Sequence, residues 1–205
     1  MTAKIQLNSA SGGGSFSLQA PSSSSNNRVM TLPDTADGTV LTTTNPKAGN
    51  TIQVVQTYKT DVFSSTPGQY TWVDVTGLSA SITTTGSNKV KVTAIVNVSP
   101  PHDGYNVYMK LLRGSTDIGL GDALGSMTRC SAAGYWAADG TDDYSPHGLM
   151  TQLLDSPGAG THTYKIQIQT NYNSITIYTG RSENGTGTGF MTSPSGFITL
   201  EEVAV

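Results

Sequence analysis

A strict alternation of apolar and polar side chains between Asn88 and Val98 constrains the fold more than any other feature of this sequence. One face of the segment collects Val90, Val92, Ala94, Val96 and Val98, and the other collects Lys89, Lys91, Thr93 and Asn97. Side chains alternate in this way along a β-strand that has one buried face. Because no window of about 12 residues keeps the 3.6-residue period of a helix, we expect an all-β protein.

The composition agrees with a β fold that has a hydroxyl-rich surface. The sequence contains 30 Thr, 23 Ser and 23 Gly, which together make 76 of its 205 residues. Threonine is branched at its β-carbon and favours strands. Only 12% of the residues are charged, about half the share of roughly 25% that is usual in globular proteins. The sequence therefore has too few charged side chains to cover the outer faces of surface helices.

The pattern from residue 51 onward predicts about nine or ten strands, separated by clusters of Gly, Pro, Asn and Asp. We expect an antiparallel β-sandwich, most simply a jelly roll, with residues 121–147 as surface loops, Trp72 in the core and a tight hairpin at Tyr172 and Asn173. The predicted strands span residues 51–58, 69–75, 78–85, 88–98, 105–112, 116–120, 147–154, 161–170, 174–179 and 197–203.

The first fifty residues differ from the rest. Tracts of Gly, Ser and Asn within residues 8–27 cannot bury enough apolar surface to fold alone. The strand-like pieces at 15–20, 28–33 and 39–42 each carry only one or two apolar anchors, and so thin a unit is marginal in isolation. We therefore divide the chain into a segment that would associate with other copies, 1–50, and a β-sandwich, 51–205. The first segment is expected to fold by sharing a core with other copies.

Charge and hydropathy exclude several functions. The net charge of -3 and the pI near 5.4 give no basic footprint for nucleic acid. No apolar run approaches the ~20 residues of a membrane helix, and no apolar core of a signal peptide is visible. The single cysteine, Cys130, excludes an internal disulfide framework. We expect synthesis in a reducing cytoplasm and no membrane insertion.

Several short motifs occur in a fixed order: Gly14-Ser-Phe-Ser-Leu-Gln-Ala-Pro21, Val29-Met-Thr-Leu-Pro33, Asp37-Gly-Thr-Val-Leu41, and then Tyr70-Thr-Trp-Val-Asp-Val-Thr-Gly-Leu78. This series, over residues 14–98, resembles tail-fibre and other appendage proteins of bacteriophages, notably marine phages and cyanophages, that carry a C-terminal β-sandwich module. The resemblance implies that the N-terminal part docks to other virion proteins, that the C-terminal domain faces outward, and that the chain forms a parallel homotrimer.

Aromatic and acidic residues in the predicted loops are candidates for contact with a glycan or receptor. Exposed rings stack on the C–H faces of sugars, and carboxylates fix the hydroxyls. Loops on a rigid sandwich commonly carry recognition, so we single out the loops at 100–106, 121–147 and 181–196. The contact candidates are His102, Asp103, Tyr105, Tyr135, Trp136, Asp139, Asp142, Asp143 and Tyr144.

Each group of candidates also has a simpler interpretation. Trp136 can pack over the end of the sandwich or in a seam between subunits. The carboxylates of residues 138–144 can belong to an Asp/Gly turn, to a calcium site or to a glycosidase pair. The three histidines lack the spacing of a zinc site, and the surroundings of Cys130 match no nucleophile motif. We therefore predict no catalytic residue, no metal site and no cofactor.

The sequence thus predicts a virion structural protein, made in the host cytoplasm, that forms a short tail fibre or spike. It would adhere to a host-surface glycan or receptor and would not be an enzyme. A capsid (head) fibre or decoration protein is the first alternative, and a polysaccharide depolymerase is the second.

Overall fold

The computed structural model describes residues 4–19, 22–23, 25, 46–99, 104–135, 146–183 and 192–205. The chain divides into two compact units, Met1–Val40 and Leu41–Val205. No helix long and apolar enough to cross a bilayer occurs among the residues described. The assignment of attachment and trimerisation to residues 1–50 stays a prediction.

The first unit contains an antiparallel hairpin of β1 (Lys4–Asn8) and β2 (Ser15–Gln19), in which Lys4 pairs with Gln19 and Asn8 with Ser15. The predicted strand at 15–20 corresponds to β2, whereas β1 was not predicted. Ile5, Leu7 and Leu18 are exposed by 64%, 60% and 44%. The hairpin therefore leaves these three apolar side chains uncovered. The predicted strands at 28–33 and 39–42 lie outside the described residues.

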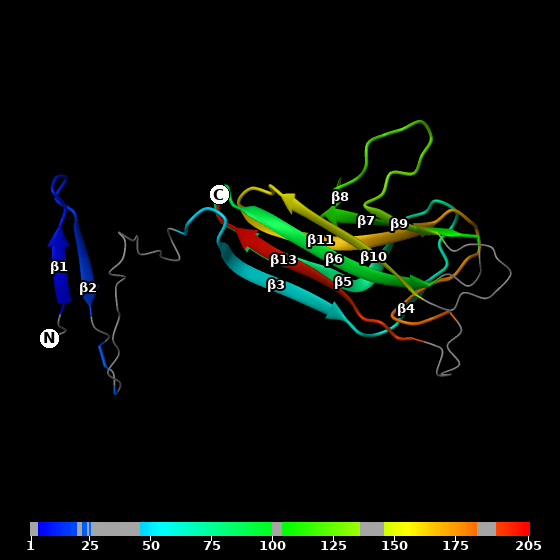
Figure 1. The fold of residues 1–205 in the computed structure, drawn as a ribbon, viewed down its shortest axis with the longest axis horizontal. Helices are drawn as coiled ribbons and strands as arrows, with labels where there is room; N and C mark the ends of the chain where they lie inside the picture. The colour runs from blue at the N-terminus through cyan, green and yellow to red at the C-terminus, as the bar shows by residue number, and fades with distance from the viewer. Residues whose placement is uncertain are drawn as a thin grey trace, which may run out of the picture. The chain divides into compact units, whose positions relative to one another are not determined.

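The second unit is an all-β sandwich of two antiparallel sheets, as predicted (Figure 1). Sheet I has the strand order β10–β6–β13–β3, and sheet II has the order β5–β11–β7 with two short strands on the outer edge of β7. Sheet I contains β3 (Thr51–Lys59), β4 (Phe63–Ser65), β6 (Lys89–Ser99), β10 (His147–Asp155), β12 (Ile177–Thr179) and β13 (Gly196–Val203). Sheet II contains β5 (Val73–Thr84), β7 (Asn106–Arg113), β8 (Thr116–Ile118), β9 (Ala132–Tyr135) and β11 (Gly160–Thr170).

The strand pairing is nested, and this defines the topology. β12 continues the line of β13 along one edge of β6, and β4 continues β3. With these pieces joined, the first strand pairs with the last (β3 with β13), the second with the seventh (β5 with β11) and the third with the sixth (β6 with β10). The fourth, β7, pairs with β8 and β9. This nesting is the eight-stranded jelly roll.

The core lies between the two sheets. The predicted inner face of residues 90–98 is confirmed, since all five of its apolar side chains are at most 1% exposed. They pack against residues of β5, β7 and β11 that point inward from sheet II, among them Ile82, Met109, Leu111, Ile166 and Ile168.

Three details of the predicted strands were wrong. Residues 73–84 form one strand, because Gly77 takes a left-handed φ of 83° at a bulge and the pairing with β11 continues beyond it. Tyr172 and Asn173 do not form a tight hairpin, since β11 belongs to sheet II and β12 to sheet I. The predicted loop at 121–147 contains β9.

A buried carboxylate ties the two sheets together near the start of β3. Glu202 on β13 is 2% exposed and accepts hydrogen bonds from Gln53 Nε2 (2.5 Å), Asn88 Nδ2 (2.9 Å) and the Thr85 backbone N–H (3.1 Å). Gln53 Nε2 also donates to the Thr83 carbonyl at 2.6 Å. Burial opposes ionisation of Glu202, but the hydrogen bonds from Asn88, Gln53 and Thr85 outweigh it and lower the pKa of this carboxyl.

Glu202→Gln is expected to cost about 1–3 kcal/mol in the free energy of unfolding, because an amide NH₂ group replaces an acceptor among three donors. A lowered pKa means that the carboxylate stabilises the fold fully above its ordinary pKa of 4.5 and loses this effect as pH falls through the lowered value. Urea unfolding at pH 7 and between pH 5 and 3 measures both effects.

Glu183→Gln serves as the control, because it removes a carboxylate outside this cluster. The E202Q protein should lose part of the acid dependence that the wild type and E183Q retain. Equal midpoints for the two variants at every pH would contradict the role given to Glu202.

Candidate functional site

The sandwich has two unlike ends. At one end the chain leads into β3, where Gly49 N–H donates to the Ala204 carbonyl (2.9 Å) and Ala204 N–H to the Asn50 carbonyl (3.0 Å). The C-terminus lies at this end, and β4 and β9 lie toward the other (Figure 1). We call the first the entering end and the second the loop end.

The three loops predicted to make contacts are anchored together at the loop end. Ser99, the last residue of β6, accepts a hydrogen bond at its Oγ from Glu183 N–H (3.1 Å), and Ser182 N–H donates to the Thr192 carbonyl (2.9 Å). His147, at the start of β10, pairs with Val98. Ser99 before 100–103, His147 after 136–145 and Glu183 before 184–191 therefore lie near the end of one strand, β6.

Of the predicted contact residues, the structure describes Tyr105 and Tyr135 and brings them close to each other. Tyr135 pairs with Asn106, the neighbour of Tyr105, across β9 and β7. Tyr135 is 57% exposed and Tyr105 is half-buried. The other predicted residues lie outside the described part of the chain: His102, Asp103, Trp136, Asp139, Asp142, Asp143 and Tyr144.

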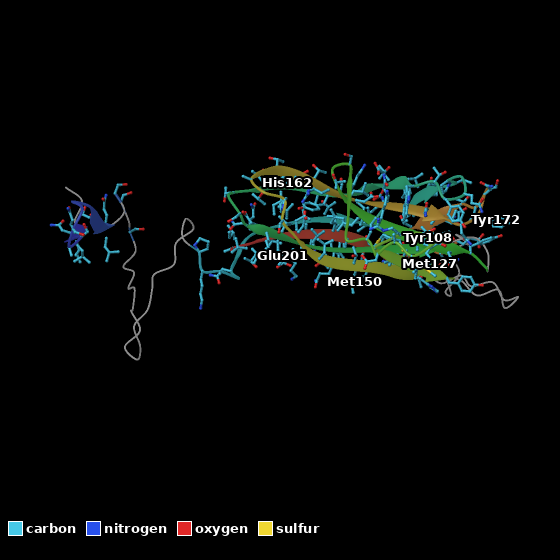
Figure 2. The ribbon with its side chains drawn as sticks, turned by 90° about the horizontal axis from the view of Figure 1, so that it is seen from above. Tyr108, Met127, Met150, His162, Tyr172 and Glu201 are labelled. Carbon is cyan, nitrogen blue, oxygen red and sulfur yellow. The ribbon has the colours of Figure 1, made fainter. Side chains whose placement is uncertain are left out.

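Tyr172 completes an aromatic pair that the sequence did not single out. Its ring centroid lies 5.2 Å from that of Tyr105, with the ring planes inclined by 50°. Asn171 supports the pair, because its Oδ1 accepts from Asn106 N–H (2.8 Å) and its carbonyl accepts from Gln69 Nε2 (2.8 Å). Tyr172 is 54% exposed and lies at the loop end (Figure 2).

Tyr70 is also presented at this end, in a turn rather than in the predicted strand at 69–75. Its φ is 56°, in the left-handed region, and its N–H donates to the Thr170 carbonyl at 2.9 Å. Gln69 N–H donates to Asn173 Oδ1 at 2.8 Å, which fixes the turn against the end of β11. The ring of Tyr70 remains 54% exposed. The Pro67-Gly68 dipeptide is the sequence signal that could have located this turn.

Trp72 was expected in the core, and this was wrong. Its side chain is half-buried outside the core cluster, with Lys110 Nζ 4.8 Å from the ring centroid. Lys110 also pairs with Asp117 at 2.9 Å. Val73 and Val75 of β5 point toward the core and Asp74 points outward, so the alternation puts Trp72 on the outer side of sheet II.

Tyr108 joins this group from β7. Burial raises the pKa of its hydroxyl, and the neighbouring Tyr70 and Cys130 raise it further, against a hydrogen bond with Thr128 that lowers it. The pKa of the Cys130 thiol is also raised by burial, so the thiol stays protonated at neutral pH and is a weak nucleophile. We refer to Tyr70, Tyr105, Tyr108, Tyr135 and Tyr172 as the aromatic end.

The aromatic end is made of neutral polar and aromatic groups. It presents tyrosine rings together with amide groups, and the side-chain Oε1 of the buried Gln169, which pairs with Tyr108 across the sheet, has no hydrogen-bond partner within the described residues. Within those same residues there is no group of three or more His, Cys, Asp or Glu side chains placed to hold a metal ion.

The fold and the site together define a jelly-roll domain with an aromatic end opposite the point where the chain enters. No protein-family model and no curated protein matches the sequence. Among solved structures, the chain is similar to the structure of the infectious bursal disease virus Gx strain, with 17% identity, coverage of 97% of this chain and 47% of that chain, and a TM-score of 0.39.

It is also similar to the VP2 subviral particle of infectious bursal disease virus, with 14% identity, coverage of 94% and 48% of the two chains, and a TM-score of 0.39. This chain spans about half the length of each of the two. The jelly-roll topology is defined by the strand pairing itself.

The left-handed turn at Tyr70 predicts a difference between two substitutions. Asparagine tolerates a positive φ, whereas a β-branched residue does not. Tyr70→Asn should stay within about 1 kcal/mol of the wild-type free energy of unfolding, and Tyr70→Val should lose about 1–2 kcal/mol more than Tyr70→Asn. Urea unfolding of the two variants measures the difference, and equal stability would show that the backbone does not need this conformation.

Proposed function

We propose that this chain is a virion structural protein, a short tail fibre or spike of a bacteriophage that adheres to a glycan or receptor on the host surface. Residues 1–50 attach it to other virion proteins, the jelly roll is the outward tip, and three copies act together. It is made in the host cytoplasm and is a binding protein rather than an enzyme.

One observation carries this proposal: the aromatic end lies opposite the end at which the chain enters the sandwich. The Gly49–Ala204 and Asn50–Ala204 hydrogen bonds mark the entering end, and the Tyr105–Tyr172 pair marks the other. A protein held through its N-terminal segment would present the aromatic end to the surroundings. The resemblance of residues 14–98 to phage appendage proteins supports the same orientation.

The side chains at the aromatic end suit a saccharide. Tyr70, Tyr135 and Tyr172 each leave more than half of the side chain exposed, which is costly for a large ring unless a partner covers it. A tyrosine ring offers an apolar face to sugar C–H groups and a hydroxyl for hydrogen bonding. Three copies would multiply a weak single-site affinity by avidity.

The proposal predicts binding to at least one polysaccharide on an array of purified bacterial lipopolysaccharides and capsular polysaccharides. Removing the ring pair by Tyr105→Ala with Tyr172→Ala should weaken that binding ~10-fold or more, since buried tyrosines are frequent hot spots. Thr161→Ala, on the outer side of sheet II near the entering end, is the control and should bind as the wild type does.

The same array separates the other functions. Binding by none of the polysaccharides would contradict adhesion to a glycan and would favour a head fibre or decoration protein. If the Y105A/Y172A protein keeps both its unfolding midpoint and its binding, the aromatic end is not the surface that binds the polysaccharide. Release of reducing sugar from a bound polysaccharide would identify a depolymerase.

A further inference from the structure

The outer faces of the two sheets differ in character. On sheet II, Ser81 and Thr163 share a hydrogen bond of 2.7 Å, Thr83 and Thr161 share one of 2.8 Å, and Lys165 pairs with Asp74 at 2.8 Å. Hydroxyls and paired charges of this kind are well solvated. These residues therefore need no partner, whereas Tyr108 and Tyr135, which point outward from the same sheet, belong to the aromatic end.

The outer face of sheet I carries large apolar side chains on both of its edge strands, β3 and β10. Five of its side chains are large, hydrophobic and at least 36% exposed: Ile52, Val54, Tyr58, Met150 and Leu154. Met150 and Glu201 mark this side of the sandwich in Figure 2. Single exposed apolar residues are normal on a surface, but a contiguous set marks an interaction site.

The register arranges these residues in rows across the four strands. Met150 pairs with Ile95, Ile95 with Phe197 and Phe197 with Tyr58, so one apolar row crosses the whole sheet. The rings of Tyr58 and Phe197 stack with centroids 5.8 Å apart. Met150 and Tyr58, at the two edges, are 59% and 58% exposed. We call these four residues the apolar row.

The next two rows toward the entering end also finish in like residues at both edges. In one, Gln152 donates to Thr93 Oγ1 (2.9 Å) and Gln56 donates to Thr199 Oγ1 (2.7 Å), which places an amide at each edge. In the other, Leu154 and Val54 form the edges, and Lys91 and Glu201 pair between them at 2.9 Å. These three rows thus have chemically matched edges, one on β10 and one on β3.

We propose that sheet I is the self-association surface, and that three copies of this chain pack these faces around an axis parallel to the strands. This inference rests on the proposed trimer and names its surface. Matched edges are what such an arrangement requires. Rotation about an axis parallel to the strands leaves each residue at the same position along that axis. The β10 edge of one copy therefore lies against the β3 edge of the next, with Met150 against Tyr58 and Gln152 against Gln56.

The dimensions of the sheet fit three copies. Four strands ~4.8 Å apart make a face ~19 Å wide, and a triangle with sides of ~19 Å has its centre ~5.5 Å from each side. Sheets packed ~10 Å apart give each side-chain layer ~5 Å. The side chains of three such faces would therefore fill the space between them.

The area and the charges are compatible with this packing. Eight residues along the strands give a face of ~26 Å by ~19 Å, or ~500 Å², which is more than half of the ~800 Å² that each partner contributes to a stable interface. Residues 1–50, which enter at the same end in every copy, would add to it. Lys91 and Glu201 already neutralise each other, so their burial adds no unpaired charge.

The test is the solution mass of the full chain by light scattering at micromolar concentration. The wild type should have the mass of three chains. Tyr58→Glu with Met150→Glu places two carboxylates against each other at each contact between copies, and the complex should dissociate at concentrations at least ~10-fold higher than for the wild type. Tyr58→Lys with Met150→Glu should restore the three-chain mass.

The charge reversal reports on contact between copies. Within one copy, positions 58 and 150 lie three strand spacings apart, ~14 Å, which exceeds the Debye length of ~8 Å at physiological salt. Ser79→Glu with Thr161→Glu is the matched control, because it adds the same two charges to the outer face of sheet II. This control should keep the three-chain mass.

Each result bears on the proposal. A three-chain mass for the Y58E/M150E protein would exclude sheet I as the interface and leave the trimer to other residues. Failure of the Y58K/M150E protein to reassemble would exclude the parallel register. A monomer or dimer for the wild type would overturn the threefold arrangement, while adhesion would still be tested independently by the polysaccharide array.

Discussion

The insertion of the last strand, β13, between β3 and β6 is the interaction on which the rest of the structure depends. This insertion pairs the last strand of the domain with its first strand, β3, and places Glu202 beside Val90. There the carboxylate accepts hydrogen bonds from Gln53 of β3 and from Asn88 in the turn before β6. On the other side of Val90, Asp155 accepts from Arg113 Nη1 (2.6 Å) and from the hydroxyl of the fully buried Tyr164 (2.8 Å). The buried Glu202 and the half-buried Asp155 thus join the two sheets near the entering end.

This closure leaves the opposite end available for recognition. The turns at the entering end are short, and there Thr84 Oγ1 donates to the Gly158 carbonyl and Gly114 N–H to the Thr163 carbonyl. At the loop end, Asn171 and Gln69 hold Tyr70 and Tyr172 in place through hydrogen bonds to backbone groups. A rigid scaffold with variable connections at one end is a common solution for binding proteins. The same scaffold offers the broad face of sheet I for packing with other copies.

The buried faces of strands that follow from local alternation were predicted correctly. Strands and turns that depend on pairing with distant segments of the chain were missed. The inner face of Val90 to Val98 followed from period two alone. β9 was missed because its Ala-Ala-Gly-Tyr sequence has little strand propensity and is held by pairing with β7. Tyr172 was placed in a hairpin because alternation does not tell which sheet the next strand joins. Tyr105 and Tyr135 were chosen as contact candidates because they are aromatic residues in predicted loops. Tyr70 was not chosen, because it was placed in a predicted strand.

The most direct test of the account is a hydrogen-exchange footprint of the full chain bound to the polysaccharide that it binds best on the array. The account predicts slowed exchange around Tyr70, Tyr105 and Tyr172, with no change at Asn50 and Ala204, because recognition takes place at the aromatic end. Protection confined to the entering end, or to the Ser81–Thr163 and Thr83–Thr161 pairs of sheet II, would contradict the central claim that the two ends of this sandwich divide attachment from recognition.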